Sequence, residues 1–150
     1  MIAYAKEKIP WDEIGPLLKE HYEEISSHHD IALKPDIDKY NLLEEGGLIV
    51  CFTARKESIL IGYAIYIVSK NLHYSDSMQA LQDVLFIRAT ERKGGVGAGL
   101  IKHADKELKK LGVQVVYQHV KVAHDFGPLL ERLGYTFVER VFSKRLDLEV

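Results

Sequence analysis

The sequence of 150 residues contains one cysteine, no long hydrophobic run and almost no net charge. Cys51 alone cannot form a disulfide within the chain, and its position in the apolar run 48–52 favours burial over reactivity. The longest apolar stretch, residues 59–68, is about half the roughly 20 residues that a membrane-spanning helix needs. A formal net charge of −2 gives no basic face for nucleic acid. We therefore expect no disulfide framework and no membrane or nucleic-acid partner.

What the sequence does contain is the composition of an ordinary globular protein. Hydrophobic residues make up 47% and charged residues 28%, which excludes a disordered chain. A chain of this length can bury one core without metal or disulfide support. The first residues include Glu7, Pro10 and Asp12 and lack the apolar core of a signal peptide. We expect residues 1–150 to form a single cytoplasmic domain.

The order of helices and strands follows from hydrophobic periodicity and from the positions of glycine, proline and capping residues. Strands are expected at residues 2–5, 48–54, 59–68, 81–87, 113–120, 135–141 and 143–148. Helices are expected at residues 11–25, from the Asp36 cap to about 43, at 100–111 and at 128–133. Gly112 and Gly134 are expected to end the last two helices. This order predicts an α/β mixed sheet with helices on both faces.

Four glycines lie close together within residues 92–101, between an expected strand and an expected helix. Glycine lets the backbone adopt φ > 0 and bring its N–H groups against an anion, and the helix N-terminus adds the positive end of its dipole. Arg92 and Lys93 add positive charge beside them. The segment therefore predicts a phosphate-binding loop, with a glycine-rich turn that holds no ligand as the simpler alternative.

Two common phosphate loops do not match the spacing. A P-loop ends in Gly-Lys-Ser/Thr, and Ala98, Gly99 and Leu100 supply neither the lysine nor the hydroxyl. A dinucleotide fold needs a third glycine where Leu100 stands, and an acid after the next strand, which is missing. The frame that fits is Arg-x-x-Gly-x-Gly, formed by Arg92, Gly95 and Gly97.

This frame, preceded by residues 85–87 and followed by 100–101, resembles the acyl-CoA pyrophosphate loop of the Gcn5-related N-acetyltransferase (GNAT) family. Residues 126–137 are similar to the family's later helix and Gly-Tyr turn. With the order of elements, the resemblance spans nearly the whole chain. It implies a GNAT-like fold, in which a mixed, mostly antiparallel central sheet has helices on both faces and its fourth and fifth strands splay apart for acyl-CoA.

The resemblance also implies that acetyl-CoA is the co-substrate and that no metal is required. The pantetheine arm would bond to the backbone of the fourth strand, with the thioester beside residues 83–86 and the pyrophosphate on the glycine loop. An open strand edge suits an arm that carries amides, and a helix N-terminus suits a phosphate. The residues expected to bind acetyl-CoA are Leu85, Phe86, Ile87, Arg92, Lys93, Gly94, Gly95, Val96, Gly97, Ala98 and Gly99.

The chemistry implied is direct attack of a neutral amine on the thioester, which needs a base, an oxyanion donor and an acid. A backbone N–H of the fourth strand is the expected oxyanion donor. Asp83 is the first candidate base, because an acid inside the apolar run 81–87 is either paired or has its pKa raised by desolvation. His119 is the second, since its unperturbed pKa lies near neutrality and it can act through water. A structural role stays open for both residues.

The family's usual acid is missing from this sequence. Most members carry a tyrosine in the helix before Gly134, and alignment on that turn puts Leu130 in its place. Tyr117 is the candidate substitute, with Tyr135 or water as alternatives, because a thiolate is weakly basic. Lys93 stands where many relatives have glycine, and a lysine there can approach phosphate.

The resemblance places the acceptor beside the first two helices and the loop before the fourth strand, where acids suit a cationic amine. The polar residues of these segments are His28, His29, Asp30, Asp36, Asp38, Tyr40, His73, Tyr74 and Asp76. The histidines lack the ligand count and spacing of a zinc site. We expect an amine-bearing small molecule or peptide as partner, and the strands after Gly134 offer edges for a homodimer.

The sequence thus predicts an acetyl-CoA-dependent N-acetyltransferase acting on a primary amine. Leu130 keeps open a catalytically weak protein that binds CoA as a regulatory ligand. An oxidoreductase with a nucleotide in the glycine loop is a third reading, which the missing third glycine disfavours.

Overall fold

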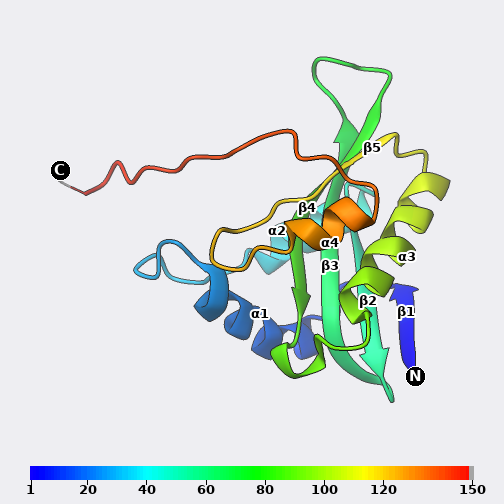
Figure 1. The fold of residues 1–150 in the computed structure, drawn as a ribbon. Helices are drawn as coiled ribbons and strands as arrows, with labels where there is room; N and C mark the ends of the chain where they lie inside the picture. The colour runs from blue at the N-terminus through cyan, green and yellow to red at the C-terminus, as the bar shows by residue number, and fades with distance from the viewer. Residues whose placement is uncertain (149–150) are drawn as a thin grey trace.

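Five strands form one mixed sheet in the computed structural model, which describes residues 1–148 (Figure 1). In spatial order they are β1 (Ile2–Lys6), β2 (Ile49–Lys56), β3 (Ile59–Lys70), β4 (Met78–Ile87) and β5 (Val115–Tyr117). The first three neighbouring pairs are antiparallel, and β4 pairs with β5 in parallel. The predicted mixed, mostly antiparallel sheet is confirmed.

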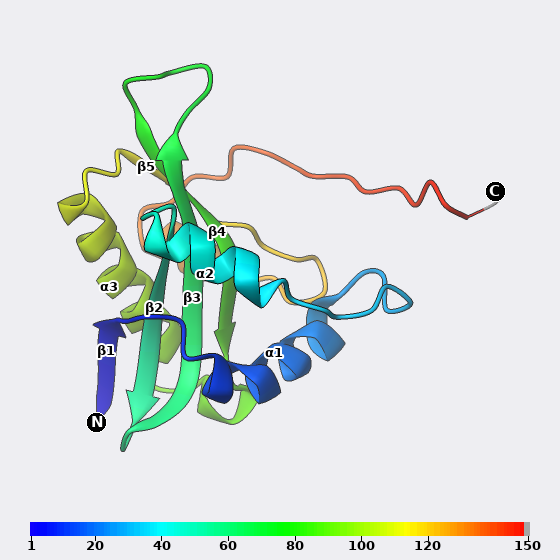
Figure 2. The same ribbon diagram turned by 180° about the vertical axis from the view of Figure 1, so that it is seen from behind.

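Helices cover both faces of this sheet, as predicted. The helices α1 (Trp11–Ile25) and α2 (Ile37–Glu45) lie on one face, and α3 (Val96–Lys110) and α4 (Gly127–Arg132) lie on the other (Figures 1 and 2). A single 3₁₀ turn, η1 (Ala89–Glu91), joins β4 to the glycine loop. Among residues 1–148, none of the helices has the length and apolar character needed to cross a membrane.

The sheet separates two hydrophobic cores. Phe52 of β2 faces α3, together with Leu100 and Leu108 of that helix, and all three are fully buried. Cys51, the next residue along β2, faces α1 and is buried as a free thiol. Burial on both faces explains why β2 reads as a continuous apolar run. Each fully buried leucine contributes roughly 1.5–3 kcal/mol relative to exposure.

Local capping signals in the sequence correctly marked three helix ends. The Asp36 carboxylate accepts a hydrogen bond from the Lys39 amide at 3.1 Å and caps α2. Gly112 follows α3 with φ of 92°, the left-handed conformation that glycine adopts without strain. Gly134 has the same φ after α4.

The predicted boundaries of the last strands were wrong. β4 begins at Met78 instead of residue 81, and β5 covers only Val115–Tyr117 instead of 113–120. Residues 135–141 and 143–148 form no strand. A β-branched and aromatic composition favours a strand only where a partner edge exists, and no strand of the described chain pairs with these residues.

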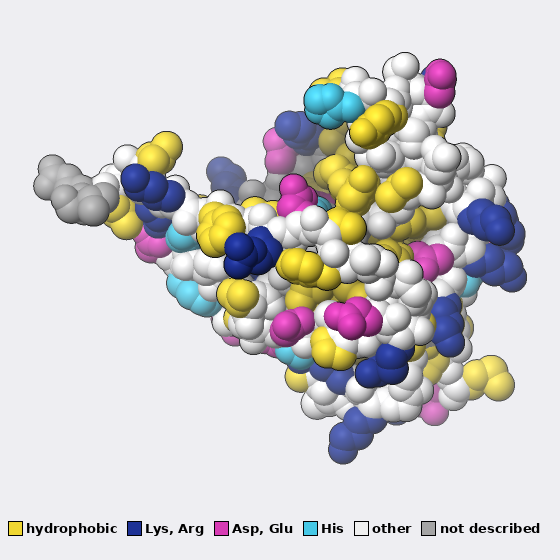
Figure 3. All heavy atoms as spheres, turned by 45° about the horizontal axis from the view of Figure 1, so that its top comes forward, with side chains coloured by type: hydrophobic (Ala, Val, Ile, Leu, Met, Phe, Trp, Pro, Cys, Tyr) yellow, Lys and Arg dark blue, Asp and Glu magenta, His cyan; other side chains and the backbone are white. Residues whose placement is uncertain are grey.

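The C-terminal segment instead runs away from the body of the protein in an extended path (Figure 1). Phe137 is 72% exposed and Phe142 81% exposed, and hydrophobic side chains lie along the segment in the space-filling view (Figure 3). Arg145 donates to Asp30 at 2.7 Å and ties the segment to the loop between α1 and α2. The homodimer expected from paired terminal strands stays a prediction.

Candidate functional site

A β-bulge in β4 gives Asp83 its position. The register between β3 and β4 shifts there, so Asp83 has no opposite residue in β3. A bulge interrupts the strict alternation of side chains along a strand. Asp83 and Val84 are therefore both directed to the face of the sheet that α1 and α2 cover. Asp83 accepts a hydrogen bond from Tyr40 of α2, and Val84 lines a cavity.

The two parallel strands part immediately before the bulge. Three residue pairs join β4 to β5, and the last of them is Leu81 with Tyr117. β5 ends there, whereas β4 continues to Ile87. Within the described chain, β4 from Asp83 onward has a strand partner on its β3 side only. Such an edge offers backbone N–H and C=O groups to an extended ligand. The predicted splaying of the fourth and fifth strands is confirmed.

The side chains on this open stretch of β4 belong to the two cores. Leu85 and Ile87 pack on the α3 side, and Phe86, 3% exposed, packs on the α1 side. The side chains of Phe86 and Ile87 are therefore unavailable to a ligand in the gap, whereas that of Leu85 is half-buried. Any acyl-CoA contact by Phe86 and Ile87 must be made by the main chain.

The glycine loop ends in a bare helix N-terminus. Gly94 and Gly95 have φ of 70° and 75°, and Gly95 caps α3 without a side-chain hydrogen bond. The first amides of a helix, here including Val96, Gly97 and Ala98, have no carbonyl partner within the helix. A Cβ at either Gly94 or Gly95 would meet nothing within 4 Å, so the left-handed backbone and not lack of space requires glycine. Together with the exposed Lys93, these free amides have the geometry that suits an anion.

Gly99 has a different reason to be glycine. Its amide donates to the Gly95 carbonyl at 2.9 Å, so it is used within α3. A Cβ on Gly99 would lie 2.1 Å from the Tyr4 hydroxyl, which in turn donates to the Val96 carbonyl. We therefore assign Gly99 to the packing of α3 on β1 and correct its expected role at the pyrophosphate.

The Arg92 side chain is not the mobile charge expected from the sequence. Its guanidinium makes two hydrogen bonds to the Glu24 carboxylate of α1, at 2.7 and 2.8 Å, and its Nε donates to the Ile87 carbonyl. It also lies over the Phe86 ring, 5.3 Å from the centroid. The hydrogen bonds from Arg92 lower the pKa of Glu24, although partial burial opposes them. Arg92 thus fixes the glycine loop to α1, and Lys93 is the charge left beside the helix N-terminus.

Asp83 is exposed although its neighbours in the sequence are apolar. The bulge turns it out of the core, and the Tyr40 hydroxyl donates to its Oδ2. Burial first, and then the bond to Asp83, raise the pKa of Tyr40, so this tyrosine stays protonated and remains a donor. Of the two alternatives stated for Asp83, the structure has the paired one.

His119 follows β5 and is attached to β4 through Gln82. The His119 amide donates to the Gln82 side-chain oxygen, and its Nδ1 lies 3.0 Å from the Gln82 carbonyl oxygen. Because a carbonyl only accepts, Nδ1 carries the hydrogen, and Nε2 of the neutral ring remains an acceptor. Since Gln82 precedes Asp83, the two candidate bases flank the same stretch of β4.

The structure removes Tyr135 from the candidates for the missing general acid. Tyr135 donates to Asp105 of α3 at 2.6 Å, and burial together with this bond raises the pKa of Tyr135, so it is a poor acid. Leu130 is buried on the apolar face of α4. Tyr117 is half-buried at the end of β5 and, within residues 1–148, its hydroxyl makes no hydrogen bond.

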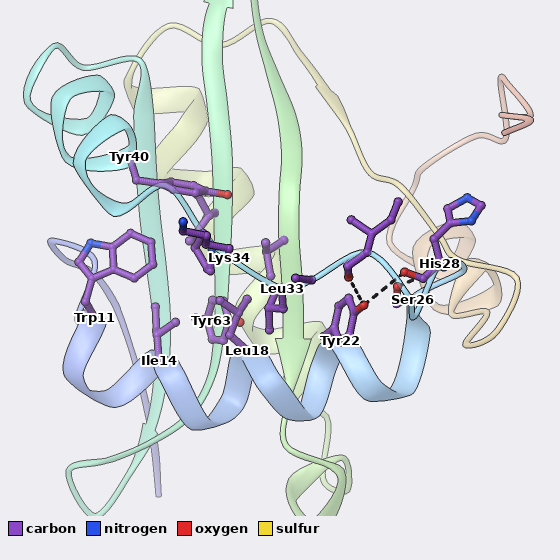
Figure 4. Close-up of a pocket in the computed structure, with 15 residues that line it drawn as sticks. Trp11, Ile14, Leu18, Tyr22, Ser26, His28, Leu33, Lys34, Tyr40 and Tyr63 are labelled. Atoms are coloured by element: carbon purple, nitrogen blue, oxygen red, sulfur yellow. Dashed lines mark hydrogen bonds between the residues drawn. The ribbon is translucent and has the colours of Figure 1, made fainter. Parts of the chain in front are cut away.

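A cavity of about 400 Å³ lies on the α1 and α2 side of β4 (Figure 4). Its volume is in the range of small-molecule sites. The residues that define it include Trp11, Leu18, Tyr22, Tyr40, Tyr63 and Val84. Of the polar residues expected to border the acceptor, His28 and Tyr40 line this cavity, whereas Asp30 pairs with Arg145 and the loop at 73–76 does not line it.

Several residues of the site were not identified from the sequence. Trp11 and Tyr22 fitted a helical apolar stripe and were assigned only to a core. Tyr63 lies in an apolar strand. Its hydroxyl could have marked it as a site residue, because a buried tyrosine usually needs a hydrogen-bond partner. Glu24 gave no signal, because its partner Arg92 is 68 residues away. Within residues 1–148 no group of three or more His, Cys, Asp or Glu side chains is arranged to hold a metal ion.

Comparison with known proteins gives matches to solved structures only. No protein-family model matches the chain, and no curated protein matches its sequence. A ribosomal-protein-alanine N-acetyltransferase from Brucella melitensis biovar Abortus 2308 matches with a TM-score of 0.74 at 15% identity, covering 97% of this chain and 99% of that one.

Two further acetyltransferases match to a similar extent. An aminoglycoside acetyltransferase from an uncultured soil metagenomic sample, in complex with sisomicin, has a TM-score of 0.75 at 15% identity and covers 99% of this chain and 97% of its own. A predicted acetyltransferase from Clostridium acetobutylicum, solved with acetyl-CoA, has a TM-score of 0.69 at 16% identity and covers 97% of both chains. At these identities the likeness establishes the fold, which is that of the GNAT acetyltransferases.

Proposed function

We propose that this chain is a GNAT-family N-acetyltransferase that transfers an acetyl group from acetyl-CoA to a primary amine. The observation that carries the proposal is the open edge of β4, which runs from Asp83 to Ile87 and leads into the bare N-terminus of α3. An extended thioester with a pyrophosphate at one end needs these two features in this order. The shared fold with acetyltransferases supports the same conclusion.

In the proposed reaction the amine nitrogen attacks the thioester carbonyl, the C–S bond breaks, and the amine's proton leaves as CoA thiol forms. Backbone N–H groups of β4 stabilise the developing oxyanion. Asp83, held by Tyr40, pairs with the incoming ammonium and takes its proton. Nε2 of His119 is the second acceptor, reached through water.

Protonation of the leaving thiolate is assigned to Tyr117 or to water. Tyr117 ends β5 where the two strands part. Tyr135 is excluded from this role by its bond to Asp105. A thiolate is a weak base, so slow protonation by water still completes the reaction.

The test is acetyl-CoA-dependent thiol release with a panel of primary amines. We expect Asp83→Asn to lower kcat/KM by roughly 10²- to 10⁴-fold and His119→Gln to lower it less, as general-base removal does. Asp76→Asn, on the exposed loop after β3, is the matched control. Failure of the wild-type protein to bind acetyl-CoA in calorimetry would sink the proposal.

A second candidate function is a regulatory module that binds CoA and turns over little. Leu130, buried in α4 where most relatives carry a tyrosine, motivates it. Binding of acetyl-CoA without thiol release across the amine panel would favour this module. A cytoplasmic location and a homodimer are further parts of the proposal.

A further inference from the structure

Two aromatic side chains of the cavity beside Asp83, those of Trp11 and Tyr22, have polar atoms that are already engaged. The Trp11 Nε1 donates to Asn41 at 2.9 Å, leaving only the carbon surface of the indole for a ligand. The Tyr22 hydroxyl donates to main-chain carbonyls of the following loop, including that of His29 at 3.0 Å. These two rings, directed into the same cavity (Figure 4), offer a ligand mainly carbon surface, and the hydroxyls of a sugar-like acceptor would be costly to bury against them without partners.

The walls instead suit a flat apolar body. Trp11 and Tyr40 meet edge to face with ring centroids 5.3 Å apart, and Ile14, Leu18 and Val84 add aliphatic surface around them. A ligand ring can stack or pack edge-on against such walls. The cavity volume of about 400 Å³ lies at the small end of the ligand-site range, which limits the body to one or two rings.

One end of the cavity adjoins a polar pair, because Tyr40 lines the cavity and donates to Asp83, which lies just outside the lining residues. The Tyr63 ring is fully buried and its hydroxyl has no hydrogen-bond partner within the described residues. Asp83 accepts from Tyr40 through Oδ2, and its Oδ1 has no partner in the same part of the chain. Burial raises the pKa of Tyr63, so its hydroxyl stays protonated.

The loop between α1 and α2 contributes a positive charge at the side of the cavity. Lys34 is exposed, lines the cavity and makes no ion pair among residues 1–148 (Figure 4). Its ammonium repels a second positive charge on a ligand whose amine is bound at Asp83. The arrangement therefore selects against diamines, polyamines and aminoglycosides.

Resting on the proposed acetyltransferase function, we propose that the acceptor is a primary monoamine with an apolar, aromatic-sized body. Its ammonium pairs with Asp83 beside Tyr40, and its body fills the space between Trp11, Tyr22 and Tyr40. Lys34 is a specificity residue that excludes acceptors with a second positive charge.

The experiment uses Trp11 as its own reporter, since it is the only tryptophan in the chain. Trp11 fluorescence is titrated with 2-phenylethylamine, 1,4-diaminobutane, glucosamine and sisomicin in the presence of CoA, which measures acceptor binding without turnover. We expect a saturable change with 2-phenylethylamine at least 100-fold tighter than with the other three. Equal or tighter binding of any of those three, or no change with 2-phenylethylamine, overturns the inference.

Charge-reversed variants test Lys34 separately. Lys34→Glu is expected to tighten 1,4-diaminobutane binding about tenfold or more relative to 2-phenylethylamine, while Lys102→Glu, on α3 across the sheet, leaves that ratio unchanged. An unchanged ratio in Lys34→Glu removes it as a specificity residue.

Calorimetry with acetyl-CoA distinguishes the two levels of the proposal. If acetyl-CoA binds and sisomicin or a peptide N-terminus is acetylated in place of 2-phenylethylamine, the acceptor class is wrong and the proposed function stands. If acetyl-CoA does not bind, the proposed function fails, whatever the amine titration gives.

Discussion

The proposed phosphate site at the N-terminus of α3 can be tested by one substitution, Gly97→Asp. Gly97 is the second residue of α3, and a Cβ there would lie 3.8 Å from Leu129 and 3.9 Å from Ile87, which are ordinary contacts. The position thus accepts a side chain. An aspartate adds a negative charge beside the amides proposed to hold pyrophosphate.

The expected loss of affinity follows from the charge. Two unit charges about 5 Å apart repel by roughly 3 kcal/mol at an effective dielectric constant near 20. That corresponds to about two orders of magnitude in the Kd for acetyl-CoA. Because the site is open to solvent, added salt should reduce the difference.

The same substitution should leave the fold intact. An acid in the first turn of a helix stabilises the helix by about 0.3–1 kcal/mol. This gain offsets the cost of placing a polar side chain whose Cβ lies near Leu129 and Ile87. We expect the free energy of unfolding to change by less than about 1 kcal/mol, a Tm shift of roughly 2–4 °C at most for a chain of this size.

The assay is titration calorimetry with acetyl-CoA, with thermal unfolding of each variant measured in parallel. Gly97→Asn is the matched control, because it has the same shape without the charge. We expect Gly97→Asn to bind several-fold more weakly than the wild type and Gly97→Asp about 100-fold more weakly. Equal affinities of the two variants would refute the placement of pyrophosphate at the N-terminus of α3.

Three further predictions concern packing, pH and assembly. Gly99→Ala should cost about 1–3 kcal/mol of stability by overpacking, since its Cβ would lie 2.1 Å from the Tyr4 hydroxyl, and adding Tyr4→Val should restore part of it in urea unfolding. Burial lowers the pKa of His21 to about 4, below its unfolded value near 6.5. Between these two pKa values, unfolding therefore takes up a proton. The free energy of unfolding is highest above pH 6.5 and decreases by about 2 kcal/mol as the pH falls to 4, a figure reduced because His21 is partly exposed. Urea unfolding of His21→Gln should lack this component and His73→Gln should keep it. The wild-type chain should sediment as a dimer at micromolar concentration and Phe142→Asp as a monomer, since Phe142 is 81% exposed; a monomeric wild type contradicts this.

Much of the fold was readable from the sequence because its signals are local. The helix at residues 11–25 was predicted with its observed bounds from apolar spacing alone. The hairpin of β2 and β3 followed from two β-rich runs around a short charged turn, and the residues at that turn, Glu57 and Ser58, take positive φ. The glycine loop was identified because only glycine adopts its backbone conformation without strain.

The site was less readable, because its geometry depends on contacts between distant residues. The sequence left open whether Asp83 is paired or desolvated, and the register shift that turns it outward depends on how β3 pairs with β4. Arg92 was expected to be free, and its partner Glu24 comes from α1. Alternating composition likewise predicted terminal strands where no partner edge exists.

The sequence by itself determined the layered fold and the glycine loop, and it supplied the candidates for the catalytic role, since periodicity and glycine positions are local signals. Only the tertiary structure decided that β4 and β5 part after Leu81, that Asp83 is paired with Tyr40, and that α1 and α2 enclose an aromatic cavity beside it. The physical reason is that strand register and helix packing bring together residues from distant parts of the chain. Local sequence patterns describe each segment separately and do not contain these contacts.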